Sequence, residues 1–316
     1  MISLRYHVVT LAAFFLALAL GVVLGSTALS DRLLSGLSAD RDELGRQVSD
    51  LQAERNGLRT ALADANAFTL AAGPRVVRDT LAGRSVLLVT TADAEPADRD
   101  ALAALLGNAG ATITGEVQLT DAFSDPSRAD QLSELATRLV PAGTVLPTTA
   151  DAGTLAGGLL GSLLLVDPRT GQPRATPAET TAALTGFGAG GFLRVGPQTR
   201  PAQLAVVLIG GPSSGPSSGE ASGDRAGMVA RFATQLDHSG AGAVLTGRPG
   251  SAADNGPIGV VRADTAATAV LSTVDDVSTA AGRVVTVLAL AEQAQGRAGR
   301  YGTASSAQAV LPEIES

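Results

Sequence analysis

The chain begins with a long apolar run, and no residue from Val8 to Leu29 is charged. A helix of about 22 residues is about 33 Å long, which is enough to cross a hydrocarbon core of about 30 Å. Arg5 and the amino terminus precede the run, whereas acidic and basic residues are mixed after it. This bias predicts a cytoplasmic N-terminus and places the rest of the chain outside the cytoplasm.

A secretion signal that is cut away is the alternative interpretation of this run. Ser26 and Ala28 are small enough for a cleavage site. However, the run is longer than the apolar region of about 7–15 residues in a usual signal, and it leads directly into another helical pattern. We therefore expect residues 1–30 to stay as a membrane anchor. Gly21 and Gly25 form a small-xxx-small face on which two membrane helices can pack, although such pairs also arise by chance.

Residues 31–72 carry a heptad pattern. The d positions are Leu37, Leu44, Leu51 and Leu58, and the a positions are Leu34, Arg41, Val48, Arg55 and Leu62. Leucine at d is compatible with a parallel dimeric coiled coil, in which polar residues at a limit the register. Glu54 at g and Arg59 at e have the spacing of an interchain salt bridge. The pattern predicts a parallel homodimer with a core of Leu34, Leu37, Leu44, Val48, Leu51, Leu58 and Leu62.

One long amphipathic helix packed against its own globular domain is the alternative to the coiled coil. Gly36, Gly45 and Gly57 interrupt the pattern. Each costs up to about 1 kcal/mol inside a helix, so the coil is predicted to be marginal alone. Glycine and proline within residues 71–76 predict the end of this helix.

The remaining pattern is typical of an α/β fold. Residues 85–91 predict a buried strand, and a helix follows with Pro96 in its first turn and Asp93 as N-cap. Further helices are predicted near residues 127–140, 149–164 and 177–185, and a second strand–helix–strand unit covers residues 202–247. The prediction is an open, mostly parallel, Rossmann-like domain over residues 73–302. Its repeated order suggests two related halves, 73–170 and 171–302.

The C-terminal part is predicted to contain one more core helix within residues 276–302. The apolar run inside it is too short to span a membrane. Asp275, Asp276 and Ser278 are suited to capping its N-terminus. Residues 303–316 are rich in alanine and serine and are predicted to be a disordered tail.

Composition excludes several functions. The 316 residues carry a net charge of −7, which argues against nucleic-acid binding because a phosphate backbone requires a basic face. There is no cysteine, and only two histidines and two methionines are present. Copper(I) sites need Cys or Met ligands and zinc sites need clustered Cys or His, so the chain alone builds neither. His238 is expected in a helix dipole rather than in a metal site.

No residue pattern predicts catalysis or a resident cofactor. A single histidine outside the predicted anchor of residues 1–30, without a nucleophile elbow, argues against a catalytic triad. Asp275 and Asp276 are explained by capping rather than by a hard cation. The Gly- and Ser-rich residues 210–224 match neither phosphate-binding motif, and two prolines remove amide donors, so they predict a surface loop. Residues 186–191 do not match the dinucleotide-binding motif any better, since no clear strand precedes them. A non-enzymatic protein is therefore expected.

The two ends of the chain resemble the actinobacterial MctB family. The opening residues "MISLRYHVVTLAAFFLALALGVVLGS" and the late residues "STVDDVSTAAGRVVTVLALAEQAQGRAGRYG" carry the resemblance. It implies an envelope protein linked to copper efflux and copper homeostasis. The chain is also similar to the related SteB proteins, which implies as an alternative a dimeric scaffold that partners a SteA-like membrane protein in cell division and cell-wall remodelling.

The residues do not predict a pore within one chain. A transmembrane β-barrel needs many alternating strands of about 10 residues and aromatic girdles, whereas this chain has two Tyr, seven Phe and no Trp. One apolar helix lines a pore only in an assembly. If copper crosses the membrane with the help of this protein, an oligomer or a partner protein is expected to form the path.

Overall fold

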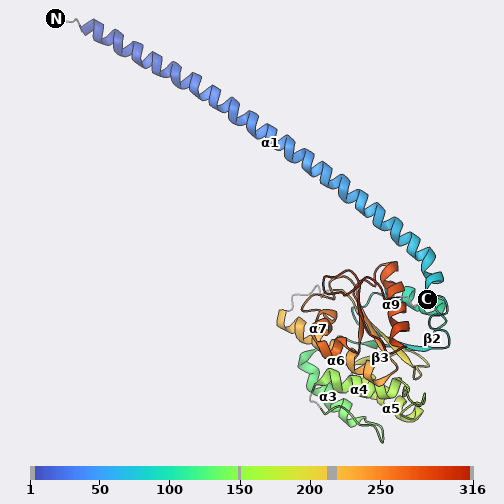
Figure 1. Cartoon of the computed structure of the whole chain (residues 1–316). Helices are drawn as coiled ribbons and strands as arrows, with labels where there is room; N and C mark the ends of the chain where they lie inside the picture. The colour runs from blue at the N-terminus through green and yellow to red at the C-terminus, as the bar shows by residue number, and fades with distance from the viewer. Residues whose placement is uncertain (1–3, 149–150, 212–218, 314–316) are drawn as a thin grey trace. The chain divides into compact units, whose positions relative to one another are not determined.

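The computed structural model describes residues 4–148, 151–211 and 219–313 (Figure 1). The side chains of residues 4–5, 25–40, 42 and 219–221 are not among those described. The chain divides into two compact units, Met1–Ala65 and Asn66–Ser316. We describe each unit by itself.

Helix α1 (Leu4–Val76) is continuous over 73 residues (Figure 1). It ends at Val76, within the residues 71–76 where the sequence predicts its end. Pro74 lies in the last turn, where it removes one amide donor and the helix ends two residues later. Gly73 packs closely instead of breaking the helix, because a Cβ atom built there would lie 2.8 Å from Cγ2 of Val284.

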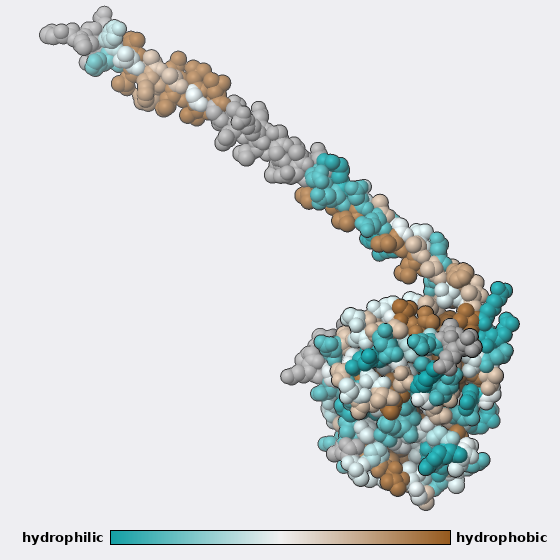
Figure 2. Space-filling model, viewed as in Figure 1, coloured by the Kyte–Doolittle hydropathy of each residue, from teal (hydrophilic) through white to brown (hydrophobic). Residues whose placement is uncertain are grey.

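The first unit consists of α1 residues. Tyr6–Leu24 is the one helical segment in the described part of the chain that is long and apolar enough to cross a membrane, with a mean hydropathy of 2.5 and none of it buried. Figure 2 shows this apolar band near the start of α1. It overlaps the predicted span of Val8–Leu29, and the side chains beyond Leu24 lie outside the described residues.

The second unit is built on one seven-stranded sheet with the order β3-β2-β1-β4-β5-β6-β7. Its strands are β1 (Ser85–Thr91), β2 (Thr112–Leu119), β3 (Leu193–Val195), β4 (Leu204–Leu208), β5 (Ala243–Thr246), β6 (Ser272–Val274) and β7 (Arg300–Tyr301). The sheet is mostly parallel, as predicted, and β3 pairs antiparallel with β2. The same sheet contains both predicted halves, since β3 lies in the second half and pairs with β2 of the first.

Helices cover both faces of the sheet. They are α2 (Pro96–Asn108), α3 (Ala129–Arg138), α4 (Ala152–Leu164), α5 (Pro177–Ala189), α6 (Gly219–Ser239), α7 (Pro257–Ala263), α8 (Thr265–Thr268) and α9 (Ala280–Gln293), with a 3₁₀ turn at Pro126–Arg128. Residues of α3 to α8 share one core cluster with Leu87 and Val89. Residues of α2 and α9 share the other with Val86 and Leu88. Alternate strand residues therefore face two separate cores.

Two helices of the larger core approach each other closely. Gly153, Gly157 and Gly161 lie four residues apart on α4, and α4 packs against α6. A Cβ atom at Gly153 would lie 2.4 Å from the carbonyl oxygen of Met228, and one at Gly161 would lie 2.3 Å from Oγ of Ser239. The two helix backbones consequently approach more closely than larger residues would allow.

Two predicted helix caps are wrong. The N-cap of α2 is Glu95, and Asp93 instead accepts a hydrogen bond from the Thr91 hydroxyl at 2.5 Å. The N-cap of α9 is Thr279, whose side chain accepts from the amide of Gly282. Asp275 forms a buried ion pair with Arg262 at 2.7 Å. Asp276 Oδ2 accepts from the Thr279 hydroxyl at 3.4 Å, and the Ser278 carbonyl oxygen accepts from Arg283 at 3.1 Å. None of the predicted residues therefore takes the cap position of either helix.

Within the predicted disordered tail, residues 303–309 make hydrogen bonds, and residues 314–316 lie outside the described residues. Asp275 Oδ1 accepts hydrogen bonds from the amides of Thr303 at 2.8 Å and Ala304 at 3.2 Å. The amide of Gly302 donates to the carbonyl oxygen of Ala309. A buried carboxylate therefore holds this segment at the edge of the sheet.

Candidate functional site

A pocket of about 160 Å³ lies at the carboxyl ends of the central strands. Strands β1 and β4 are neighbours, but β1 connects to β2 on one side and β4 connects to β5 on the other. The chain therefore leaves the sheet in opposite directions, which creates a crevice at this edge. Ligands of open α/β sheets bind in such crevices.

Several loops and one helix supply the pocket wall. Its polar residues include Thr91, Asp93, Thr120, Asp121, Ser124, Ser222, Arg225, Ser251 and Asn255. Its apolar residues include Leu119, Phe123, Ile209, Val229 and Pro257. At Gly210 a Cβ atom would lie 2.4 Å from the carbonyl oxygen of Asp93, so glycine is required where the loops after β1 and β4 meet. The wall is thus neither strongly apolar nor dominated by one charge.

Charges of both signs surround the pocket. Asp93 and Asp121 follow β1 and β2 and are exposed, and Arg225 lies on α6. The pKa of Asp125 is lowered, mainly because the hydroxyl and amide of Ser127 donate to its carboxylate, and the nearby Arg225 adds a smaller contribution. The site therefore offers carboxylate acceptors together with one cationic donor.

Ser251 carries a hydroxyl that is buried in this wall. The residue is only 1% exposed, and among the described residues its Oγ has no hydrogen-bond partner. The Ser251 backbone is well held, because its carbonyl oxygen accepts from the amides of Ile258 and Gly259. Leaving a buried hydroxyl unpaired costs about 1–3 kcal/mol. Such a group in a pocket wall is a candidate ligand contact.

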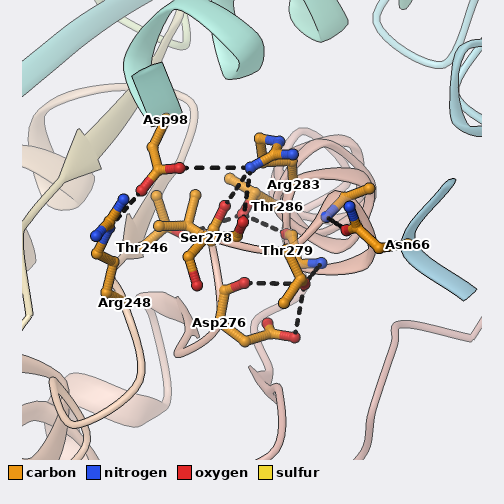
Figure 3. A network of polar contacts seen from close by, with 12 residues as sticks. Asn66, Asp98, Thr246, Arg248, Asp276, Ser278, Thr279, Arg283 and Thr286 are labelled. Carbon is orange, nitrogen blue, oxygen red and sulfur yellow. Dashed lines mark hydrogen bonds and ion pairs between the residues drawn. The ribbon is translucent and has the colours of Figure 1, made fainter. Parts of the chain in front are cut away.

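A polar network joins residues of α2, of the loops after β5 and β6, and of α9 (Figure 3). Asp98 of α2 accepts from Arg248 at 2.6 Å and pairs with Arg283 of α9 at 3.4 Å. The Asp98 side chain is 7% exposed, so its charge is compensated within the protein. Asn66 Oδ1 accepts from the amide of Ala280 at 2.8 Å, which ties the last part of α1 to the N-terminus of α9.

The structure places the predicted coiled-coil residues on α1. Leu44, Leu51, Leu58 and Leu62 are between 61% and 65% exposed, and Val48 is 51% exposed. Leu34, Leu37 and Gly25 have side chains outside those described, and Gly21 has no atom within 4 Å of a built Cβ. The described heptad residues form an exposed apolar stripe on α1.

No metal centre is found in the described part of the chain, where no three His, Cys, Asp or Glu residues gather closely enough to hold an ion. His238 is exposed and lines a separate open hollow with Arg174 and Gln235. The Gly- and Ser-rich segment lies partly outside the described residues, at positions 212–218. Asp275 and Asp276 lie apart from the pocket wall.

Sequence reasoning missed the pocket because its wall comes from loops after four separate strands. A usable signal was present in Asp93 and Asp121, which closely follow β1 and β2 in the sequence. No sequence pattern marked the loop after β5, which contains Ser251, as part of a binding site. This loop reaches the pocket wall only because of the order of the strands in the sheet.

The fold defines an α/β protein with a mostly parallel sheet and one N-terminal helical segment that is long and apolar enough to cross a membrane. Comparison with known proteins defines it further: a family model described as "Copper transport outer membrane protein, MctB" matches residues 1–312, and the chain belongs to this family. The "Copper transporter MctB" of Mycobacterium tuberculosis (strain ATCC 25618 / H37Rv) is 39% identical over 98% of this chain and 99% of the relative. The protein of the same name from Mycobacterium leprae (strain TN) is 37% identical over the same shares. The resemblance of the two chain ends to the MctB family is thereby confirmed.

Proposed function

We propose that this protein is a membrane-anchored envelope protein that acts in copper transport and copper homeostasis. The observation that carries the proposal is the family match over residues 1–312, together with relatives named copper transporters that align over nearly their whole length. The apolar segment Tyr6–Leu24 supports attachment to a membrane. The anchor is retained, with the N-terminus in the cytoplasm and the α/β domain outside it.

Continuity of α1 supports retention of the anchor. A signal peptidase that cut near Ala28 would cut within a helix that runs to Val76. The last turns of this helix are part of the second unit, through the Asn66 hydrogen bond and the Gly73 contact. The anchor therefore connects to the α/β domain through a continuous helix rather than through a flexible linker.

The residues favour an indirect role in moving copper. The chain has no cysteine, and its described part has no cluster of metal ligands. Copper is the cargo here, and soft ligands for copper(I) have to come from another protein or from an assembly. The chain serves as a non-enzymatic structural subunit that positions its α/β domain next to such a partner.

Two copies of the chain assemble through α1 in this proposal. Exposed leucine side chains at heptad spacing are costly in water, and burying each one contributes about 1.5–3 kcal/mol. Pairing in parallel buries Leu44, Leu51 and Leu58 at the d positions and brings Glu54 of one helix near Arg59 of the other. The stripe and the membrane segment lie on the same helix, which favours a parallel arrangement.

Gene deletion tests the copper function. We expect deletion to change both growth on graded copper and the copper content of the cells, and the intact gene to restore both. Unchanged copper tolerance and content would contradict the proposal. A gene lacking the codons for residues 4–24 is the matched control, and it is expected not to restore either property because the domain is no longer anchored.

The SteB-like role in cell division remains an alternative expectation, to which the comparisons give no support. It has a separate readout in the same strains, namely cell length and recovery of a SteA-like membrane protein with the chain. Altered cell length at unchanged copper content would favour it over the copper function.

A further inference from the structure

The pocket at the switch point contains one half of the usual binding site of a doubly wound sheet. In such sheets an acidic residue near the end of the second strand accepts hydrogen bonds from ribose hydroxyls. Asp121 lies two residues after the last residue of β2 and lines the pocket. Its exposed carboxylate has two oxygens that can accept from two neighbouring hydroxyls.

The other half of that site, which binds phosphate, is replaced by carboxylates. Phosphate normally sits on a glycine-rich turn at the N-terminus of the first crossover helix. Here the residues between β1 and α2 are Ala92, Asp93, Ala94 and Glu95, without a glycine. Asp93 lines the pocket, and Glu95 is the N-cap of α2. Negative charge at the helix N-terminus repels a phosphate group from this position.

Ser251 supplies a second, independent indication of a ligand. Its hydroxyl is buried and unpartnered among the described residues, in a loop that reaches the pocket from the other side of the switch point. A Cβ atom at Gly247 would lie 2.6 Å from Ser251 Oγ and 2.7 Å from Ile209 Cγ1, so the hydroxyl is packed beside the apolar end of the β4 wall. A hydroxyl both donates and accepts, which suits a hydroxyl on a ligand.

We propose that this pocket binds a small neutral ligand that presents a vicinal diol. Asp121 accepts from the diol, and Ser251 pairs with a further polar group of the ligand. Ile209, Val229 and Pro257 contact the apolar face of its ring. The carboxylates before α2 exclude phosphorylated forms. Monosaccharides and unphosphorylated nucleosides share this chemistry, and the proposal goes beyond the copper function.

Ligand binding to the full-length protein in detergent tests the proposal by isothermal titration. The probes are methyl α-D-mannoside and adenosine, which carry vicinal diols, and 2′-deoxyadenosine and AMP as their controls. We expect binding of at least one diol probe and tenfold or greater weakening when the diol is removed. AMP is expected to bind at least tenfold more weakly than adenosine if adenosine is the diol probe that binds. The mannoside and adenosine arms distinguish the two sources of the ligand.

Variants assign the binding to the pocket. Asp121→Asn is expected to weaken the bound diol probe tenfold or more, and Ser251→Ala is expected to weaken it severalfold. Asp130→Asn on α3, an exposed carboxylate that does not line the pocket, is the control and should bind as the parent does. Because Asp121 is exposed, its replacement leaves the core intact, and an unchanged thermal midpoint checks this.

Three results would overturn the proposal: no binding of either diol probe, equal binding of adenosine and its 2′-deoxy form, or tighter binding of AMP than of adenosine. Equal affinity of Asp121→Asn and the parent protein would also overturn it. None of these readouts involves copper, so failure here leaves the copper function standing and failure of the copper function leaves the binding result standing.

Discussion

Asp237 is the clearest case of a residue whose environment changes its chemistry. It lies near the C-terminal end of α6, is 8% exposed, and accepts a hydrogen bond from the amide of Ala243 at 2.6 Å. Burial raises the pKa of its carboxyl group to about 7, and the hydrogen bond from Ala243 offsets only part of that effect. At a pH between this value and the unfolded Asp pKa of about 3.9, Asp237 is therefore protonated in the native domain and ionised in the unfolded chain.

This difference makes stability depend on pH in a defined direction. Between about pH 4 and pH 7 the native state binds more protons than the unfolded state, so the free energy of unfolding falls as pH rises, by at most about 1.4 kcal/mol per pH unit. Asp237→Asn keeps an acceptor oxygen and removes the ionisation. Chemical unfolding of the two detergent-solubilised proteins at several pH values measures the difference.

We expect the stability of Asp237→Asn relative to the parent protein to increase from pH 5 to pH 8. The pH-independent loss or gain from the substitution itself cancels in that comparison. A stability difference that stays constant across this range would show that Asp237 does not hold a proton in the native state.

At the scale of elements, the helices and strands with a pattern over many consecutive positions could be predicted from the sequence, whereas the shortest strands could not. The strand at Ser85–Thr91 and the helices near α2 and α4 were recognisable because several consecutive positions show one pattern. Strands β3, β6 and β7 have two or three residues each, which is too few for a period. Asp93 and Asp275 resemble caps locally, but their partners are fixed by tertiary contacts.

The exposed stripe of α1 leads to a prediction about pairing. The chain has no cysteine, so a single introduced cysteine reports only on its own position. In membranes under mild oxidation, Leu51→Cys at a d position is expected to form a covalent dimer in high yield, because d residues of a parallel pair face each other. Ala53→Cys, on the outer face of the same heptad, is the matched control and should remain largely monomeric. Denaturing electrophoresis without reductant measures both.

Equal cross-linking at positions 51 and 53 would indicate random collision rather than a coiled coil. Absence of cross-linking at both positions would contradict pairing through this stripe and would leave Leu44 to Leu62 for a different partner.

At the scale of the whole molecule, the anchor, the α/β domain and the family membership form a consistent account. The mostly parallel sheet follows from the order of strands and helices in the sequence. The pocket does not, because it depends on β1 and β4 being neighbours although they lie more than a hundred residues apart in the chain. Sequence patterns give the elements, whereas the strand order decides which loops meet.

The central claim is that the N-terminal helix stays attached and holds the domain outside the cytoplasm. Labelling of Ser305→Cys with a membrane-impermeant maleimide in intact cells, followed by the intact mass of the labelled protein, tests it most directly, because residue 305 is exposed and the chain has no other cysteine. We predict labelling without lysis, on a protein that keeps residues 4–29. Labelling only after lysis, or a labelled protein that begins near Leu29, would contradict the account.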